Sequence, residues 1–273
     1  MNYHTTNWIL SKMNEHLDEI KNIYPEHQML GLFYQGSANY GLDTPTSDVD
    51  TKYLIFPNLR DLAMGRKQIS NTHVRANEEH TDVKDVRHYL STFRSQNINF
   101  MEILYTPYYI INPEYKDLWA ELTEHRDEIT HYYPMRAVMS MVGQAEDKYK
   151  AMYRESEAKV EKLAKYGYDP KELCHLMRFC FFLEKYIRGA SYQDCLILPD
   201  SIRSELIQVK QGCWSEPEAK TMREYYINRI HDLRDEFFAN ATQTELESSV
   251  AVDEFLIDWQ LRAMTRALQK EFN

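Results

Sequence analysis

The sequence is short of several features that would place it in a specialised class of protein. It has only four cysteines, Cys174, Cys180, Cys195 and Cys213, and none of them forms a C-x-x-C pair. A disulfide scaffold or a cysteine-based zinc site is therefore not expected. No stretch approaches the roughly 20 apolar residues of a membrane helix, and the N-terminus lacks the positive start and apolar block of a signal peptide. These absences predict a cytoplasmic protein with reduced thiols in its core and no membrane partner.

Positive charge is also scarce. The chain has 32 lysine and arginine residues against 42 aspartate and glutamate residues, which gives a formal net charge of −10. Because nonspecific binding to nucleic acid depends on neutralising phosphates, this balance argues against a surface that is basic all over, while a local basic cleft stays compatible with it. The 273 residues are 43% apolar, which is enough for one large domain or two ordinary ones.

The first part of the chain has the pattern of a small α/β unit. Apolar residues at helical spacing predict an amphipathic helix over residues 5–24, and two short apolar runs, 28–35 and 49–56, predict neighbouring strands. One or two further strands then lead into a helix near residue 90. We therefore expect an α+β fold, with a small mixed β-sheet core in residues 1–112.

The rest of the chain reads almost entirely as helix, so we expect an all-helical second domain over residues 113–273. The strongest helix prediction is 170–188, in which Asp169 caps the start, Pro170 occupies the first position and Gly189 ends the helix. The other predicted helices in this part cover residues 114–131, 134–166, 217–238 and 252–271.

Glycine is used sparingly, yet three of the eight glycines, Gly31, Gly36 and Gly41, stand just before Asp48 and Asp50. Side chains two residues apart on a strand point to the same face, so the two carboxylates are expected within a few ångströms of each other. At an effective dielectric constant near 20 and a separation of about 4 Å, they would repel by about 4 kcal/mol. A divalent cation would offset this repulsion, and carboxylate ligands favour Mg²⁺ or Mn²⁺ over zinc.

A Gly-Ser pair precedes these acids. Glycine at position 36 would let a phosphate group approach the backbone closely, and Ser37 would add a hydroxyl and an amide donor to the same anion. The ten residues from Ala38 to Ser47 would return the chain to the carboxylates. Phosphate donors and metal ligands on adjacent elements predict a site for a nucleoside triphosphate held on two metal ions.

The order of these residues is similar to a known signature. The pattern resembles the motif of the DNA polymerase β-type nucleotidyltransferase superfamily, because a Gly-Ser pair is followed by ten residues and then by Asp-Val-Asp. With two later segments, the chain more closely resembles the predicted nucleotidyltransferases associated with RNA repair ligases. This resemblance implies metal-dependent transfer of a nucleoside monophosphate from an NTP to a hydroxyl of an RNA end, tRNA, protein or small molecule, with release of pyrophosphate. The three segments are GSANYGLDTPTSDVDTKYLIFP, TDVKDVRHYLSTFRSQNINFMEILYTP and YGYDPKELCHLMRF.

The superfamily resemblance also implies a third acidic residue on a later strand, which completes the metal site. Asp82 is the best match because it precedes a helix much as the family's aspartate does, and Glu79 and Asp85 are the alternatives. We expect Asp48, Asp50 and Asp82 to be the catalytic metal ligands. The candidate contacts for the triphosphate or the acceptor on the predicted helices are Lys148, Lys171, His175 and Arg178.

Other interpretations fit parts of the same pattern. One is a nucleotidyltransferase fold that binds nucleotide or RNA as a regulatory module without catalysis, although the intact Gly-Ser pair and acids argue against a decayed site. Another is a glycosyltransferase whose Asp-x-Asp pair holds a nucleotide sugar, but the 47 residues before Asp48 are short for the α/β region that such an enzyme needs. The basic residues on the predicted helix 170–188 have a simpler alternative, which is the solvated face of that helix.

Overall fold

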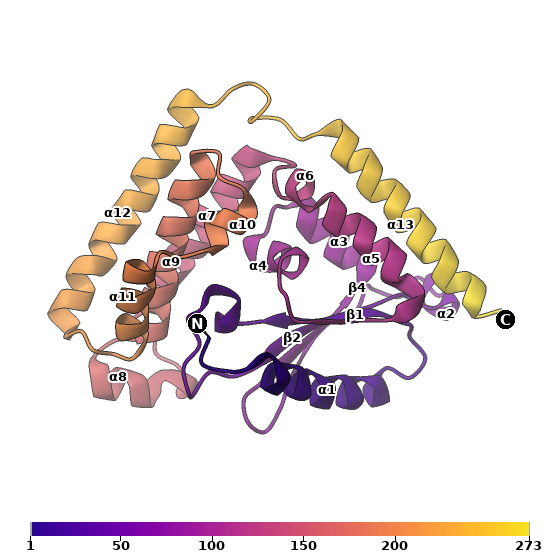
Figure 1. The fold of residues 1–273 in the computed structure, drawn as a ribbon, viewed down its shortest axis with the longest axis horizontal. Coiled ribbons are helices and arrows are strands. Elements are labelled where there is room, and N and C mark those ends of the chain that lie inside the picture. The colour runs from indigo at the N-terminus through magenta and orange to yellow at the C-terminus, as the bar shows by residue number, and fades with distance from the viewer. Residues whose placement is uncertain (1, 273) are drawn as a thin grey trace. The chain divides into compact units, whose positions relative to one another are not determined.

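The computed structural model describes residues 2–272 and has an α+β fold (Figure 1). Its contacts divide the chain into two compact units. The first, here called the sheet unit, comprises the described residues of Met1–Asn39, Asp43–Tyr132 and Ser248–Asn273. The second, here called the helical unit, comprises Tyr40–Leu42 and Tyr133–Glu247. A small mixed sheet and a series of C-terminal helices confirm the predicted fold class.

Five strands form one mixed sheet in the order β3-β4-β2-β1-β5. The two predicted neighbouring strands pair antiparallel as β1 and β2, and β2 pairs in parallel with β4. The outer strands β5 and β3 pair antiparallel with β1 and β4, respectively. The bounds of the strands are Met29–Gln35 for β1, Asp50–Ile55 for β2, Ser70–Val74 for β3, His80–Asp85 for β4 and Tyr109–Ile111 for β5.

Helix α1 (Thr6–Ile23) covers one face of this sheet (Figure 1). The Thr5 side chain accepts a hydrogen bond from the backbone N–H of Trp8, which satisfies one of the unpaired amides of the first turn. The apolar stripe of α1 packs against the strand side chains that point to this face, and the helix predicted over residues 5–24 is confirmed. The core on this side includes Ile9, Met13, Leu17, Ile20, Leu32, Tyr34, Val49, Tyr53, Ile55 and Val83.

Helices α3 (Val86–Arg94) and α5 (Lys116–Glu124) lie on the other side of the sheet (Figure 1). Phe33 on β1 packs against Trp119 on α5, with ring centroids 4.4 Å apart. The shorter helical segments before residue 133 are η1 (Ser37–Tyr40), α2 (Leu59–Ala63), α4 (Ile98–Met101), η2 (Glu102–Leu104), η3 (Pro113–Tyr115) and α6 (Arg126–Thr130).

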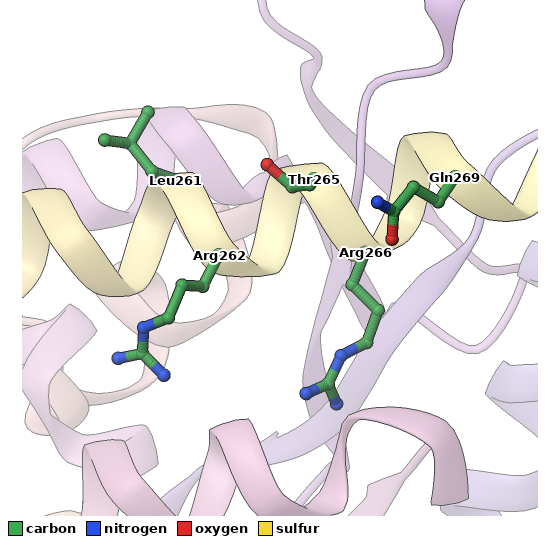
Figure 2. A pocket seen from close by; sticks show the side chains of 5 residues that line it. All are labelled: Leu261, Arg262, Thr265, Arg266 and Gln269. Atoms are coloured by element: carbon green, nitrogen blue, oxygen red, sulfur yellow. The ribbon is translucent and has the colours of Figure 1, made fainter.

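The last helix of the chain, α13 (Val250–Lys270), also belongs to the sheet unit. Its fully buried Trp259 donates a hydrogen bond from the indole N–H to the backbone carbonyl of Leu118 on α5 at 2.8 Å. Arg262 and Arg266 on the same helix point toward α5 and line a shallow surface hollow (Figure 2). Each of these arginines pairs with an acidic side chain of α5, so the hollow is part of the contact between two helices.

The helical unit is built around α9, against which α7, α10, α11 and α12 pack. The predicted ends of α9 are confirmed: the Asp169 side chain accepts from the backbone N–H of Lys171, Pro170 starts the helix, and Gly189 follows it with a φ of 77°. The helices of this unit are α7 (Pro134–Ala151), η4 (Glu157–Lys159), α8 (Val160–Tyr166), α9 (Pro170–Ile187), α10 (Tyr192–Leu196), α11 (Asp200–Lys210) and α12 (Glu216–Asn240).

One predicted helix is wrong in its extent. The stretch 134–166 was expected as a single helix, but α7 ends at Ala151 and α8 begins only after a break. At the break, the Lys159 side chain donates to the carbonyl of Ala151, and the N–H of Asp169 donates to the carbonyl of Met152, both at 2.9 Å. Partners from outside the helix thus satisfy carbonyls that a continuous helix would have used itself. Helices α10 and α11 were not predicted.

The compact units divide the chain later than the expected boundary near residue 112. The main division falls between Tyr132 and Tyr133, so α5 and α6 belong to the sheet unit, and α13 returns to it. The helical pattern of these segments does not reveal that they pack beside a sheet, because a helix buries the same kind of apolar stripe against either partner.

The structure also bears on the cysteines and on membrane-spanning helices. Three of the four cysteines are buried thiols, as expected, whereas Cys213 is an exposed thiol. Among the helices of residues 2–272, none is long and apolar enough to cross a membrane.

Candidate active site

The two aspartates of the Asp-x-Asp motif stand at the start of β2. Asp50 is the first residue of β2, and Asp48 stands in the segment that leads into this strand. Val49 between them is buried in the core under α1, so the alternation of side chains into β2 directs the Asp50 carboxylate to the other face. Both aspartates are partly buried.

The parallel pairing of β2 with β4 brings Asp82 to the same face. Lys52 is the register partner of Asp82, and neighbouring partners in a sheet direct their side chains to the same side. Because Lys52 lies two residues after Asp50, all three side chains share this face. The preferred third acid of the sequence prediction is therefore on the same face of the sheet as Asp50.

Asp50 is held by His80, the residue beside it on β4. The backbone N–H of His80 donates to Asp50 Oδ1 at 2.9 Å, and Nδ1 of the His80 ring lies 2.9 Å from the same oxygen. Burial and the negative charge of Asp48 raise the pKa of Asp50 in spite of these contacts. A cation bound to Asp50 would oppose this rise in its pKa.

The surroundings of Asp82 are different. The Thr72 hydroxyl donates to Asp82 Oδ1 at 2.5 Å, and the ammonium of Lys52 lies 3.3 Å from Oδ2. Burial alone would raise the pKa of Asp82, but the positive charge of Lys52 and the hydrogen bond from Thr72 outweigh it, so the pKa is lowered. A cationic side chain of the protein therefore already compensates this carboxylate.

Lys52 is a residue of the site that the sequence argument missed. Its side chain is only 2% exposed, and its ammonium lies 4.2 Å from the centre of the Phe100 ring. The Tyr89 hydroxyl donates to the backbone carbonyl of Phe100 at 2.5 Å, which holds this ring in place. Burial lowers the pKa of Lys52, and the charge of Asp82 opposes this effect. The signal was available, because Lys52 continues the alternation of the two motif aspartates.

The two alternative third acids have other partners. Glu79 contacts Nε2 of His16 and the guanidinium of Arg75, each at 3.2 Å. Asp85 caps α3 by accepting from the backbone N–H of Arg87 at 2.8 Å, and it also forms an ion pair with the Arg87 side chain. These contacts give both acids structural roles in the sheet and at the helix start.

The Gly-Ser corner is shaped by a tyrosine. A β carbon on Gly36 would lie 2.5 Å from the hydroxyl of Tyr34, which accepts a hydrogen bond from the N–H of Ala38 at 3.2 Å. This contact requires glycine whether or not a phosphate binds there. The Ser37 hydroxyl donates to Oγ of Ser47 at 3.2 Å, which joins the corner to the residue that precedes the first motif aspartate.

The four basic residues predicted to contact phosphate all belong to the helical unit. Lys148 on α7 pairs with Glu172 at 3.0 Å, and Lys171 on α9 is exposed. His175 is partly buried, and burial together with the positive charges of Arg178 and Lys148 lowers its pKa well below the usual value. Several cationic side chains therefore gather around one neutral imidazole.

Arg178 does not lie on a solvated helix face, because it is only 5% exposed. Its guanidinium carbon lies 3.9 Å from the centre of the Tyr40 ring, which is a cation–π geometry. Nearby in the same unit, the Lys210 ammonium donates to the carbonyl of Leu42 at 2.9 Å. These contacts explain why Tyr40–Leu42, inside the loop between the Gly-Ser pair and the aspartates, belongs to the helical unit.

The predicted site residues thus fall into two sets. The sheet unit holds Gly36, Ser37, Asp48, Asp50 and Asp82, and the helical unit holds Lys148, Lys171, His175 and Arg178. Across residues 2–272, no group of three or more histidine, cysteine, aspartate or glutamate side chains is arranged to hold a metal ion. No model of a known protein family matches the chain, and a search of curated proteins found no match to it. The family resemblance therefore stays an interpretation of the motif residues alone.

Proposed function

We propose that the protein is a metal-dependent nucleotidyltransferase that acts in the cytoplasm. In the reaction, the oxygen of a hydroxyl acceptor forms a bond to the α-phosphorus of an NTP, and the bond from this phosphorus to the bridging oxygen of the β-phosphate breaks. Pyrophosphate leaves, and the proton of the hydroxyl passes to solvent. The observation that carries the proposal is the partly buried pair of Asp48 and Asp50, in which burial and then the charge of Asp48 raise the pKa of Asp50.

Two carboxylates fit the way in which Mg²⁺ or Mn²⁺ binds together with a triphosphate. In such sites Mg²⁺ is usually held by one or two protein carboxylates, and substrate phosphates and water complete its shell. A cluster of three protein ligands is therefore not required. The contacts of His80 are to Oδ1 of Asp50, so we expect Oδ2 of Asp50 and the carboxylate of Asp48 to hold the ion. Bound there, the ion would neutralise charge that develops on the departing pyrophosphate.

The remaining predicted residues have supporting roles in this proposal. The Ser37 hydroxyl and amide stay candidate donors to a phosphate group. In the helical unit, Lys148, Lys171, His175 and Arg178 stay candidate contacts for phosphate or for an acceptor such as an RNA end, a tRNA or a protein, because cationic groups attract phosphate.

The test is transfer of label from NTPs carrying ³²P at the α-phosphate, in the presence of Mg²⁺ and with cellular RNA or cellular protein as acceptors. Asp48→Asn and Asp50→Asn should each lose at least about a hundredfold in rate, which corresponds to about 2.7 kcal/mol. Asp18→Asn is the matched control, because Asp18 is an exposed aspartate on α1. Transfer that persists in both motif variants would contradict the proposal. Binding of NTP by the wild-type protein without any transfer would instead favour the regulatory module.

A further inference from the structure

We infer that the candidate site takes a single divalent ion, held by Asp48 and Asp50, and that Lys52 supplies the fixed positive charge beside Asp82 where a second ion would otherwise bind. This inference rests on the proposed function and deepens it. It changes the role expected of Asp82 from a metal ligand to the partner of a buried ammonium.

The first argument is the occupancy of the Asp82 carboxylate. Thr72 donates to Oδ1 at 2.5 Å, and Lys52 lies 3.3 Å from Oδ2, so each oxygen has a partner from a neighbouring strand. The two partners come from β3 and β2, which flank β4 on either side. An ion bound to Asp82 would therefore have to share these oxygens with Thr72 and with the positively charged ammonium of Lys52.

The second argument is the position of Lys52, which is fixed by its surroundings. The side chain is 2% exposed, in the middle of β2. Phe100 lies against the ammonium at 4.2 Å, and the hydroxyl of Tyr89 holds the backbone of Phe100. A lysine at the surface would swing into water when an ion approached, but this enclosed side chain keeps its charge beside Asp82.

The third argument is the difference in charge between the two ends of the site. At one end, Asp48 and Asp50 are two acids separated by one residue, and His80 is the partner of Asp50 on β4. At the other end, Asp82 and Lys52 form a pair with no net charge. A divalent ion is attracted to the first end, whereas at the second it would meet an ammonium group of the same sign.

The experiment counts bound ions directly. Equilibrium dialysis is carried out with Mn²⁺ and the α,β-methylene analogue of ATP on both sides of the membrane, with the GTP, CTP and UTP analogues in parallel. The wild-type protein should reach a plateau of one Mn²⁺ per chain. Lys52→Met removes the charge and keeps most of the length of the side chain, so its plateau should rise to two. Asp82→Asn should stay at one, because Asp82 is not a ligand.

Several results would overturn the inference. A plateau of two ions on the wild-type protein would overturn it and leave the proposed function intact. A plateau of one ion on folded Lys52→Met would have the same meaning. A fall to zero in Asp82→Asn would show that Asp82 ligates the ion. No bound ion on the wild-type protein would overturn the proposed function as well. Circular dichroism shows whether Lys52→Met folds, and if it does not, the counts for the wild type and for Asp82→Asn decide the question.

Discussion

Replacing Gly36 by alanine should destabilise the sheet unit even when no nucleotide is present. The new β carbon would lie 2.5 Å from the oxygen and 2.8 Å from Cζ of Tyr34. Tyr34 cannot easily move aside, because it is 2% exposed and packs edge-on against Tyr108 with ring centroids 5.5 Å apart. Overpacking of this kind costs about 1–3 kcal/mol, and loss of the hydrogen bond from Ala38 adds about 1 kcal/mol. We expect the free energy of unfolding to fall by about 2–4 kcal/mol.

Urea unfolding followed by circular dichroism measures this change, and two further variants identify its cause. Tyr34→Leu removes the ring that the methyl group would meet, so Gly36→Ala should cost at least about 1 kcal/mol less in the Tyr34→Leu background than in the wild type. Gly143→Ala is the control, because Gly143 lies within α7 and a β carbon there meets nothing within 4 Å. It should stabilise the protein by about 0.5–1 kcal/mol, as expected for glycine within a helix.

The reasoning would be refuted if Gly36→Ala unfolded at the same urea concentration as the wild type while losing nucleotidyl transfer. That result would assign the glycine to the approach of a phosphate, as the sequence argument proposed. Equal costs of Gly36→Ala in the two backgrounds would also refute it, because a clash with Tyr34 requires the two changes to be coupled.

Two other predictions concern stability. Trp259→Phe leaves the carbonyl of Leu118 without its donor and opens a cavity, so the free energy of unfolding in urea should fall by about 2–4 kcal/mol. The control is Trp8→Phe, at a half-buried tryptophan, which should cost less than about 1 kcal/mol. Equal losses in the two variants would contradict the role of the indole hydrogen bond. Burial lowers the pKa of His16 below its ordinary 6.5, and the pKa of its partner Glu79 is also lowered because hydrogen bonds outweigh burial. As the pH falls below 6.5, the unfolded chain takes up a proton at His16 that the folded chain does not bind, so the free energy of unfolding falls. His16→Gln should reduce the slope of this fall by up to about 1.4 kcal/mol per pH unit. An unchanged slope would contradict the assignment of this pH dependence to His16.

Local features of the fold were predictable from the sequence, and long-range ones were not. The ends of α9 follow from Asp169, Pro170 and Gly189, all of which act within one turn of the helix. By contrast, the return of α13 to the sheet unit depends on contacts such as the one between Trp259 and Leu118, which are 141 residues apart. Periodicity shows that a helix has an apolar face, but it does not show what that face covers.

The same limit applies to the candidate site. The expectation that Asp48 and Asp50 share a direction depends only on the alternation of neighbouring residues, so it can be made from the sequence alone. The choice of Asp82 over its rivals depends on the register of two parallel strands that are separated by 30 residues in the chain. Composition and spacing give no access to that register, and for this reason the third acid was left open.

Lys52 shows how the electrostatics of the site follow once the register is known. At an effective dielectric constant near 20 and a distance of about 4 Å, a divalent ion is attracted to the carboxylate of Asp82 by about 8 kcal/mol and is repelled by an ammonium at the same distance by about the same amount. The two effects cancel, so the pair of Lys52 and Asp82 offers a second ion no net attraction. Asp50, by contrast, has His80 as its partner on β4 in place of a lysine. The ion should therefore bind at the aspartate pair, and the position of one lysine decides how many ions the site accepts.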